Sequence, residues 1–128
     1  MPVAKAEPIS GEVTRGQWAT FFIDFSKRNK SRATRLEIFS DLGAQEAERN
    51  LPLNGISLEE KGNDAPRIEI MLGGDSPDDD RHLTHVIARA THIFPKVGAD
   101  GIDEALEIED ANGVKSLLSF ESLPELTR

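Results

Sequence analysis

The sequence contains no cysteine, which excludes disulfides, thiolate nucleophiles and cysteine-ligated metal sites. It also has no run of about eighteen apolar residues, so we expect no transmembrane helix. Residues 1–14 carry two prolines and no apolar run, and they therefore lack the apolar segment of a secretory signal. From these absences we expect a cytoplasmic protein without a membrane partner.

Positive charge is scarce. The chain has 15 Lys and Arg residues against 23 Asp and Glu residues, which gives a net charge of −8. A chain this acidic is repelled by phosphate backbones, so nucleic acid is an unfavourable partner. The exception is local, since five of the 15 basic residues fall between positions 27 and 35. This group, which we call the basic segment, consists of Lys27, Arg28, Lys30, Arg32 and Arg35.

The length of 128 residues fits one domain and is too short for two ordinary ones. The hydrophobic share of 38% and the charged share of 30% lie outside the range typical of disordered chains. We expect a flexible N-terminal arm at residues 1–13, a single domain at 14–121 and a C-terminal tail at 122–128.

A helix is predicted over residues 15–28. Apolar side chains recur there at the spacing of one helical face, and basic residues follow where they suit the negative end of the helix dipole. Thr14 and Gln17 have the spacing of a capping box, in which each side chain bonds the other residue's backbone amide. The apolar stripe, which we expect to face the core, consists of Trp18, Phe21, Phe22 and Phe25.

After the helix the apolar period falls to two residues, which indicates strands with one buried face. Leu36 and Ile38 alternate with polar neighbours, while proline and Asn-Gly predict a turn at residues 51–55. We expect strands at 35–39, 45–49, 56–58 and 67–72, loops at 61–64 and 73–80, and either two strands or one bent strand over 82–97.

The last hairpin is defined by its turn. Residues 110–114 suit a three-residue loop in which Gly113 is left-handed. In that register Leu106 faces Leu118 and the apolar residues share one face, whereas a two-residue turn would split them between both faces.

One helix followed by about seven short strands, with no second helix to connect parallel strands, predicts an α+β fold with an antiparallel meander. The sheet must cover its apolar face, either with the helix or by curling into a small barrel or roll.

Three segments stand out together: W-x-x-F-F from Trp18, L-P-L-x-G-I from Leu51 and L-E-I-E-D-x-x-G from Leu106. In this order they resemble an uncharacterised family of short, single-domain bacterial proteins, catalogued only as a domain of unknown function. The resemblance covers residues 12–121. It implies a bacterial, stand-alone, soluble protein and transfers no catalytic or binding residue.

The histidines and an acidic run are the candidates for a metal or catalytic site. His82 and His85 lie three positions apart, which on a strand places their rings on opposite faces. His92 is an even number of positions from His82 and so has the same parity in the alternation of faces. The run from Asp78 to Asp80 lacks the spacing of a calcium loop, and no serine stands in a known nucleophile motif. We therefore expect no metal, no cofactor and no catalytic residue.

Three hypotheses for the function stay open. The first is a non-catalytic protein-interaction module, in which the basic segment docks an acidic partner or the acidic residues 100–110 of a second copy. Such self-association requires the two stretches to lie on different faces of the molecule. The second is a small metal-binding protein or enzyme that uses residues 78–85. The third is weak RNA binding through residues 27–35, although no aromatic side chain there could stack on bases.

Overall fold

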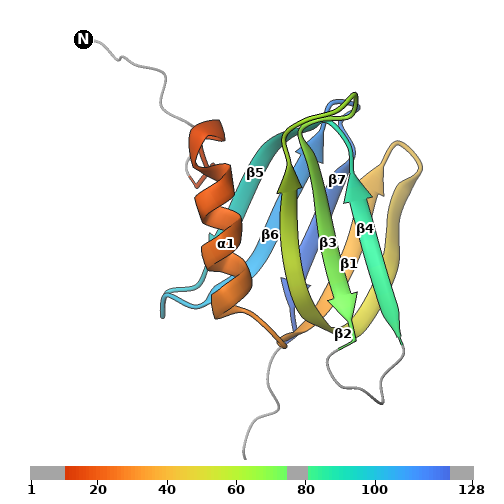
Figure 1. The fold of residues 1–128 in the computed structure, drawn as a ribbon. Coiled ribbons are helices and arrows are strands. Elements are labelled where there is room, and N and C mark those ends of the chain that lie inside the picture. The colour runs from red at the N-terminus through yellow and green to blue at the C-terminus, as the bar shows by residue number, and fades with distance from the viewer. Residues whose placement is uncertain (1–10, 75–80, 122–128) are drawn as a thin grey trace, which may run out of the picture.

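A short helix precedes seven antiparallel strands in the computed structural model, which describes residues 11–74 and 81–121 (Figure 1). The predicted helix is confirmed, since a 3-10 turn, η1 (Arg15–Gln17), leads into α1 (Trp18–Arg28). The strands are β1 (Ala33–Ser40), β2 (Gly43–Glu59), β3 (Arg67–Gly73), β4 (His82–Ile87), β5 (Ala90–Val97), β6 (Asp103–Asp110) and β7 (Lys115–Phe120).

The strands form one sheet in the order β4-β3-β2-β1-β7-β6-β5. Each neighbouring pair is antiparallel, which confirms the predicted sheet type. The order is not a simple meander, however. Strands β1 to β4 form one meander and β5 to β7 another, and the two are joined because β7 pairs with β1. This pairing covers edges that β1 and β7 would otherwise expose.

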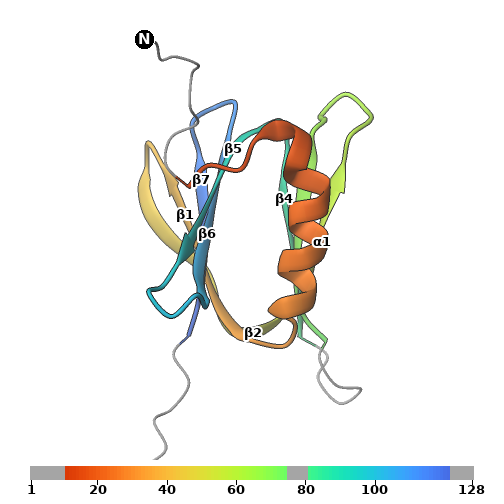
Figure 2. The ribbon, with the colours of Figure 1, turned by 90° about the vertical axis from the view of Figure 1, so that its left-hand side faces the viewer.

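Strand β2 passes from one layer of the sheet to the other (Figure 2). Its first part, up to Pro52, pairs with β1, and its second part, from Leu53, pairs with β3. The layer β2-β1-β7-β6-β5 therefore faces the layer β2-β3-β4, and α1 covers an open side between them. The sheet is strongly curled but does not close into a barrel, because β4 and β5 remain its two edges.

The turn predicted at residues 51–55 is wrong, because these residues lie inside β2. The left-handed φ of 68° at Asn50 and a register irregularity between Leu53 and Gly55 bend the strand without ending it. Pro52 lies opposite the first residue of β1, where the ladder ends and a missing N–H costs least.

The capping box predicted at Thr14 is also wrong, because the Thr14 side chain makes no capping hydrogen bond. Instead the N–H of Gln17 donates to the carbonyl oxygen of Thr14 at 2.9 Å. The first turn is a tight 3-10 turn, and its backbone bond satisfies the amide that the hydroxyl was expected to bind.

Residues 82–97 form two strands, β4 and β5, rather than one bent strand. Arg89, between them, has a left-handed φ of 53°. Its N–H donates to the carbonyl of Asp64, and its carbonyl accepts from the N–H of Ala111. Since β4 and β5 are the two edges of the sheet, this short corner draws the edges together at one end and accounts for the curl.

The core lies between the two layers and under α1. The helical stripe is confirmed, since Trp18, Phe22 and Phe25 are at most 2% exposed, and Phe21 is half-buried against them. Inward side chains of all seven strands complete the cluster. The predicted register of the last hairpin is confirmed by Leu106, which lies opposite Leu118.

Candidate functional site

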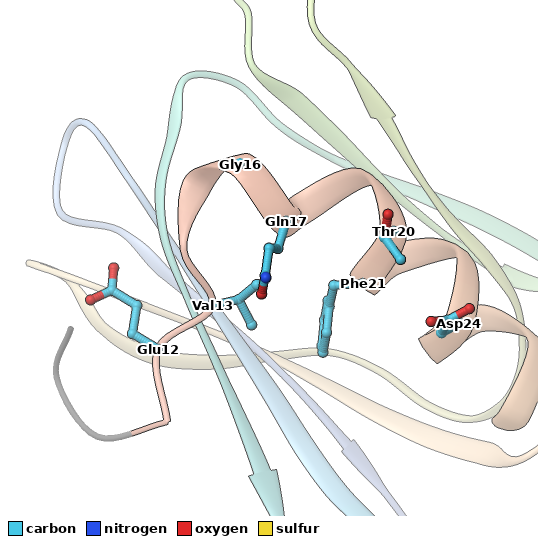
Figure 3. Close-up of a pocket in the computed structure, with 7 residues that line it drawn as sticks. All are labelled: Glu12, Val13, Gly16, Gln17, Thr20, Phe21 and Asp24. Atoms are coloured by element: carbon cyan, nitrogen blue, oxygen red, sulfur yellow. The ribbon is translucent and has the colours of Figure 1, made fainter. Parts of the chain in front are cut away.

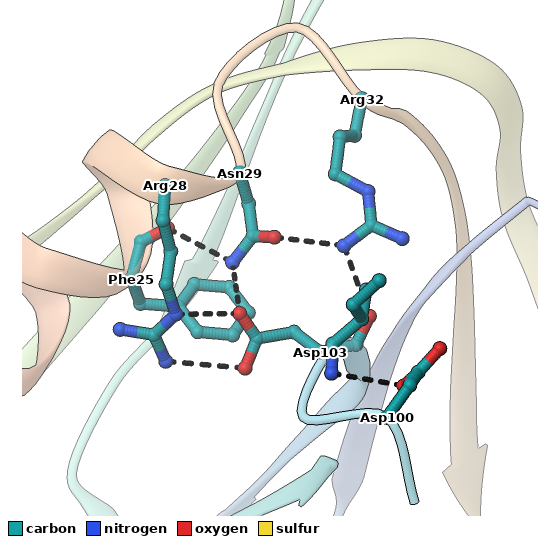
Figure 4. A network of polar contacts seen from close by, with 7 residues as sticks. Phe25, Arg28, Asn29, Arg32, Asp100 and Asp103 are labelled. Atoms are coloured by element: carbon teal, nitrogen blue, oxygen red, sulfur yellow. Dashed lines mark hydrogen bonds and ion pairs between the residues drawn. The ribbon is translucent and has the colours of Figure 1, made fainter. Parts of the chain in front are cut away.

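Asp103, the first residue of β6, is a buried carboxylate that binds a cation of the basic segment (Figure 4). Only 4% of this residue is exposed. Arg28 donates to it twice, from Nε to Oδ2 at 2.6 Å and from Nη2 to Oδ1 at 3.1 Å. This two-point geometry is the strongest form of an arginine–carboxylate pair.

Asn29 and Arg32 complete the network around Asp103. Asn29 Nδ2 donates to Asp103 Oδ2 at 2.8 Å and to the carbonyl of Phe25 at 3.0 Å. Arg32 Nη1 donates to Asn29 Oδ1 at 2.8 Å and to the Asp103 carbonyl at 2.9 Å. The Arg32 guanidinium also lies 4.1 Å from the ring centroid of Phe120, within reach of a cation–π contact.

The end of the helix brings these side chains together. Helix α1 stops at Arg28, and the N–H of Asn29 still donates to the carbonyl of Phe25 as the cap of the last turn. Ser31 then adopts a left-handed φ of 73°, which turns the chain so that Arg32 returns toward Asp103. The chain thus reverses between α1 and β1, with Arg28 and Asn29 on the Asp103 carboxylate and Arg32 on the Asp103 backbone carbonyl.

The network keeps the Asp103 carboxylate charged. Burial alone would raise the pKa of Asp103, but the hydrogen bonds from Arg28 and Asn29 and the charges of Arg28 and Arg32 outweigh burial. The net pKa of Asp103 therefore lies below its ordinary value of 3.8. The same hydrogen bond raises the pKa of Arg28, so both partners stay ionised at neutral pH.

Two shallow hollows flank the network. One, of about 390 Å³, has Gly101 and Ile102 on its wall beside Arg28 and Arg32. The other, of about 480 Å³, lies toward Phe120 and contains several carboxylates. Ile102 is 54% exposed, so an aliphatic side chain stands open to solvent beside two fixed guanidinium groups.

The rest of the basic segment does not join this site. Lys27 is exposed on the last turn of α1, and Lys30 Nζ donates to Asn54 Oδ1 at 3.0 Å. Arg35 lies on β1 and pairs with Glu37 and Glu46, each at 3.3 Å. The five basic residues are therefore divided among four locations.

The basic and acidic stretches do not lie apart, as self-association through them required. Asp103 belongs to the acidic residues 100–110, yet it is bound by Arg28 and Arg32 of the same molecule. The premise of complementary patches on different faces is therefore wrong for these three residues. Tertiary packing brings together stretches that are 75 positions apart in the sequence.

The histidines occupy the faces that their spacing predicts. His82 is exposed on β4, while His85 points between the layers, where its Nε2 lies 2.9 Å from the Ser116 hydroxyl of β7. Asp78, Asp79 and Asp80 lie outside the described residues. Within residues 11–74 and 81–121, no three metal-binding side chains converge.

The contact between His85 and Ser116 was missed by sequence reasoning, because it joins two strands 31 positions apart. Ser116 is only 2% exposed, so its hydroxyl is closed to a substrate. Burial lowers the pKa of His85, which keeps the ring neutral at pH 7. The pair is therefore a polar link between the two layers rather than a nucleophile and its base.

A third hollow, of about 470 Å³, runs along the N-terminal half of α1 (Figure 3). Val13, Gln17 and Phe21 line it, with Glu12 at one end and Asp24 at the other. Glu12 is already bound, because its carboxylate lies 2.7 Å from His92 Nδ1. Glu12 and Val13 were predicted to belong to the N-terminal arm, yet both pack against the domain.

These features define a small α+β domain in which a buried aspartate binds two surface arginines, one through its carboxylate and one through its backbone carbonyl. The chain belongs to a family of unknown function, DUF5335, whose model matches residues 9–127. This match confirms the family predicted from the sequence. No curated protein and no solved structure matches the chain. Among the described residues, α1 and η1 are too short to cross a membrane.

Proposed function

We propose that this protein is a non-catalytic protein-interaction module of the bacterial cytoplasm. Its binding face consists of Arg28, Arg32 and Ile102. One observation carries this proposal: a buried aspartate holds one guanidinium group with its carboxylate and a second with its backbone carbonyl, beside an exposed aliphatic side chain.

The fixed arginines are prepared for binding. A free arginine side chain loses considerable rotamer entropy when it meets a partner, and that loss weakens the contact. Here Asp103 and Asn29 have already restricted both side chains. Arg28 uses Nε and Nη2 and Arg32 uses Nη1 in the network. Among the described residues, none bonds Arg28 Nη1 or Arg32 Nη2, and these groups can meet a ligand.

The chemistry of the face indicates the kind of partner. Guanidinium groups favour carboxylates, and the hollow at Ile102 favours an aliphatic side chain. The partner is therefore an acidic protein segment that carries an aliphatic residue between its carboxylates. The overall charge of −8 opposes acidic partners at long range, so local geometry must supply the specificity.

A peptide titration tests this proposal. The probe is a synthetic peptide of alternating glutamate and leucine, and the readout is the NMR signal of the Arg28 and Arg32 side-chain N–H groups and the Ile102 methyls. We expect these signals to shift together. Ile102→Glu should weaken binding by about tenfold, because it places a carboxylate against the peptide's own. Leu42→Glu, at an aliphatic residue that is 88% exposed, is the matched control and should change nothing.

Two outcomes would contradict the proposal: signals that move elsewhere on the molecule, or an equal loss of binding in both variants. The same titration with single-stranded RNA tests the RNA hypothesis. Shifts at residues 27–35 with RNA but not with the peptide would favour RNA binding, and that binding would weaken steeply with salt.

A further inference from the structure

The two edges of the sheet are protected very differently. Edge strand β5 contains Pro95 and Lys96, and its pairing with β6 is irregular at two points. The N–H of Val13 also donates to the carbonyl of Ile93, so the segment before η1 covers part of this edge. Proline, lysine, bulges and covering segments are the devices that keep sheet edges from pairing with other chains.

Within residues 11–74 and 81–121, edge strand β4 has none of these devices. It contains no proline, no lysine and no other fully charged residue, and its register with β3 is regular throughout. Val86, on its outer face, is 48% exposed. No strand of the described part of the chain pairs with its free side.

The backbone groups on this free side can be identified from the ladder. The N–H of Gly74 donates to the carbonyl of Arg81, which continues the β3–β4 register. In an antiparallel ladder, the residues that bond a given neighbour alternate along the strand. Arg81 bonds β3, so His82, Thr84 and Val86 direct their N–H and C=O groups away from it. These six groups form an open row at the edge.

We infer that β4 pairs with β4 of a second copy of this chain, antiparallel and about a two-fold axis at Thr84. In this register Thr84 lies opposite Thr84 of the other copy, and His82 lies opposite Val86. Each of the three N–H and three C=O groups then finds a partner. Opposing residues share a face, so the outer and inner faces of the two sheets continue into each other.

Charge favours a second copy as the occupant. Residues 82–87 carry no acidic or fully charged basic side chain, so two β4 strands lie side by side without like charges in contact. An acidic or basic foreign strand would find no opposite charge on this edge. The strand is short, so the interface is small and the dimer weak and concentration-dependent.

Sedimentation of the full chain at increasing concentration tests the association. We expect a monomer–dimer equilibrium that strengthens with salt, because salt screens repulsion between two chains of charge −8. Thr84→Lys should weaken it by at least about tenfold, since two ammonium groups would meet on the axis. Ser57→Lys is the control, because Ser57 is also exposed in the same layer but lies on the inner strand β2.

Crosslinking tests the register and does not depend on the lysine variant folding well. The chain has no cysteine, so a disulfide in Thr84→Cys can form only between two copies. Opposed residues in a ladder lie at a Cα separation that a disulfide spans. We expect rapid disulfide formation in Thr84→Cys, slow formation in Ser57→Cys, and preferential mixed disulfides between His82→Cys and Val86→Cys chains.

Several results would overturn this inference. A monomer at every concentration would do so, as would equally slow crosslinking of Thr84→Cys and Ser57→Cys. A dimer that persists in Thr84→Lys would place the interface elsewhere. A dimer that dissociates with added salt would likewise indicate contacts between charged stretches instead of β4.

Discussion

Asp103 is stabilised in its charged form, and this makes the fold sensitive to acid. Its folded pKa lies below the ordinary value of 3.8, so the unfolded chain takes up the proton first as the pH falls. The stabilisation is complete above that ordinary value and is lost as the pH drops through the folded pKa. The free energy of unfolding should therefore decline in strongly acidic solution.

Asp103→Asn should lower the free energy of unfolding by about 2 kcal/mol. Breaking a fully buried ion pair costs roughly 3–5 kcal/mol, but the Arg28 side chain is 47% exposed and water can solvate it once it is unpaired. Urea unfolding gives the measurement. Glu104→Gln, at the exposed neighbour, is the control and should stay within about 0.5 kcal/mol of the parent. Equal losses in both variants would show that the network does not stabilise the fold.

At the scale of single residues, the sequence indicated the arginines of the candidate site but not the aspartate that binds them. The charge density of residues 27–35 identified Arg28 and Arg32, and both lie in the network. Nothing local distinguished Asp103 from the other acidic residues of 100–110. Its role depends on burial, which arises only when β6 packs beside the end of α1.

Ser26 attaches α1 to β2. Its hydroxyl oxygen accepts the N–H of Ile56 at 2.9 Å, and the hydroxyl lies 3.4 Å from the Ile56 carbonyl. Ile56 comes just after the register irregularity between Leu53 and Gly55, where the partner of β2 changes from β1 to β3. On the side that β1 has left, the Ile56 N–H has no strand to bond. The helix thus satisfies a polar group that the bent strand leaves open.

Ser26→Ala should destabilise the protein by about 1–2 kcal/mol, because it leaves the Ile56 N–H unsatisfied in a half-buried position. Alanine is the better helix former, so helix propensity alone predicts the opposite sign. Thermal unfolding decides between the two effects. Ser57→Ala, at an exposed serine on β2, should leave the melting temperature nearly unchanged, and a similar loss there would contradict the role of Ser26.

Elements were predictable where the signal was local. The helix shows a clear apolar period, and β3 and the last hairpin combine such a period with turn residues. All three elements are confirmed, although the capping box at the start of the helix is not. Strand β2 was divided by the predicted turn because Pro52 and Gly55 resemble turn residues. Their role in bending a strand from one layer to the other depends on partners that the local sequence does not reveal.

Across the whole molecule, His85 and Ser116 form a polar link between the two layers, and the link depends on pH. Burial lowers the pKa of His85 below its ordinary value of 6.5, so the unfolded chain binds the proton first. Stability is therefore full above that value and falls as the pH drops toward the folded pKa. This window lies above the one set by Asp103.

The stability of the parent protein should fall as the pH drops through 6.5, the ordinary pKa of histidine, and His85→Gln should flatten that slope. The glutamine amide can still bond Ser116 but does not titrate. His82→Gln, which changes the exposed histidine of the same strand, should keep the slope of the parent. Urea unfolding at several pH values measures this, and an unchanged slope in His85→Gln would assign the effect to another group.

The strand order lay beyond sequence reasoning for a physical reason. Each hairpin follows from neighbouring residues, but the pairing of β1 with β7 joins the two meanders through contacts distant in the sequence. Alternating apolar residues show only that a strand has a buried face, and many strand orders would satisfy that pattern. The curl likewise results from the short corner at Arg89 rather than from any local signal.

The position of β7 inside the sheet also affects how the chain folds while it is being synthesised. Arg35 of β1 and Ser119 of β7 are 84 positions apart, and a ribosome needs roughly 4–17 seconds to add that many residues at ~5–20 per second. Throughout that time β1 has an unpaired side beside newly made strands. Contacts this distant also favour slow folding. Nascent chains that stall before residue 115 would expose both β1 and β6, and they should be the form most prone to aggregate and most dependent on chaperones.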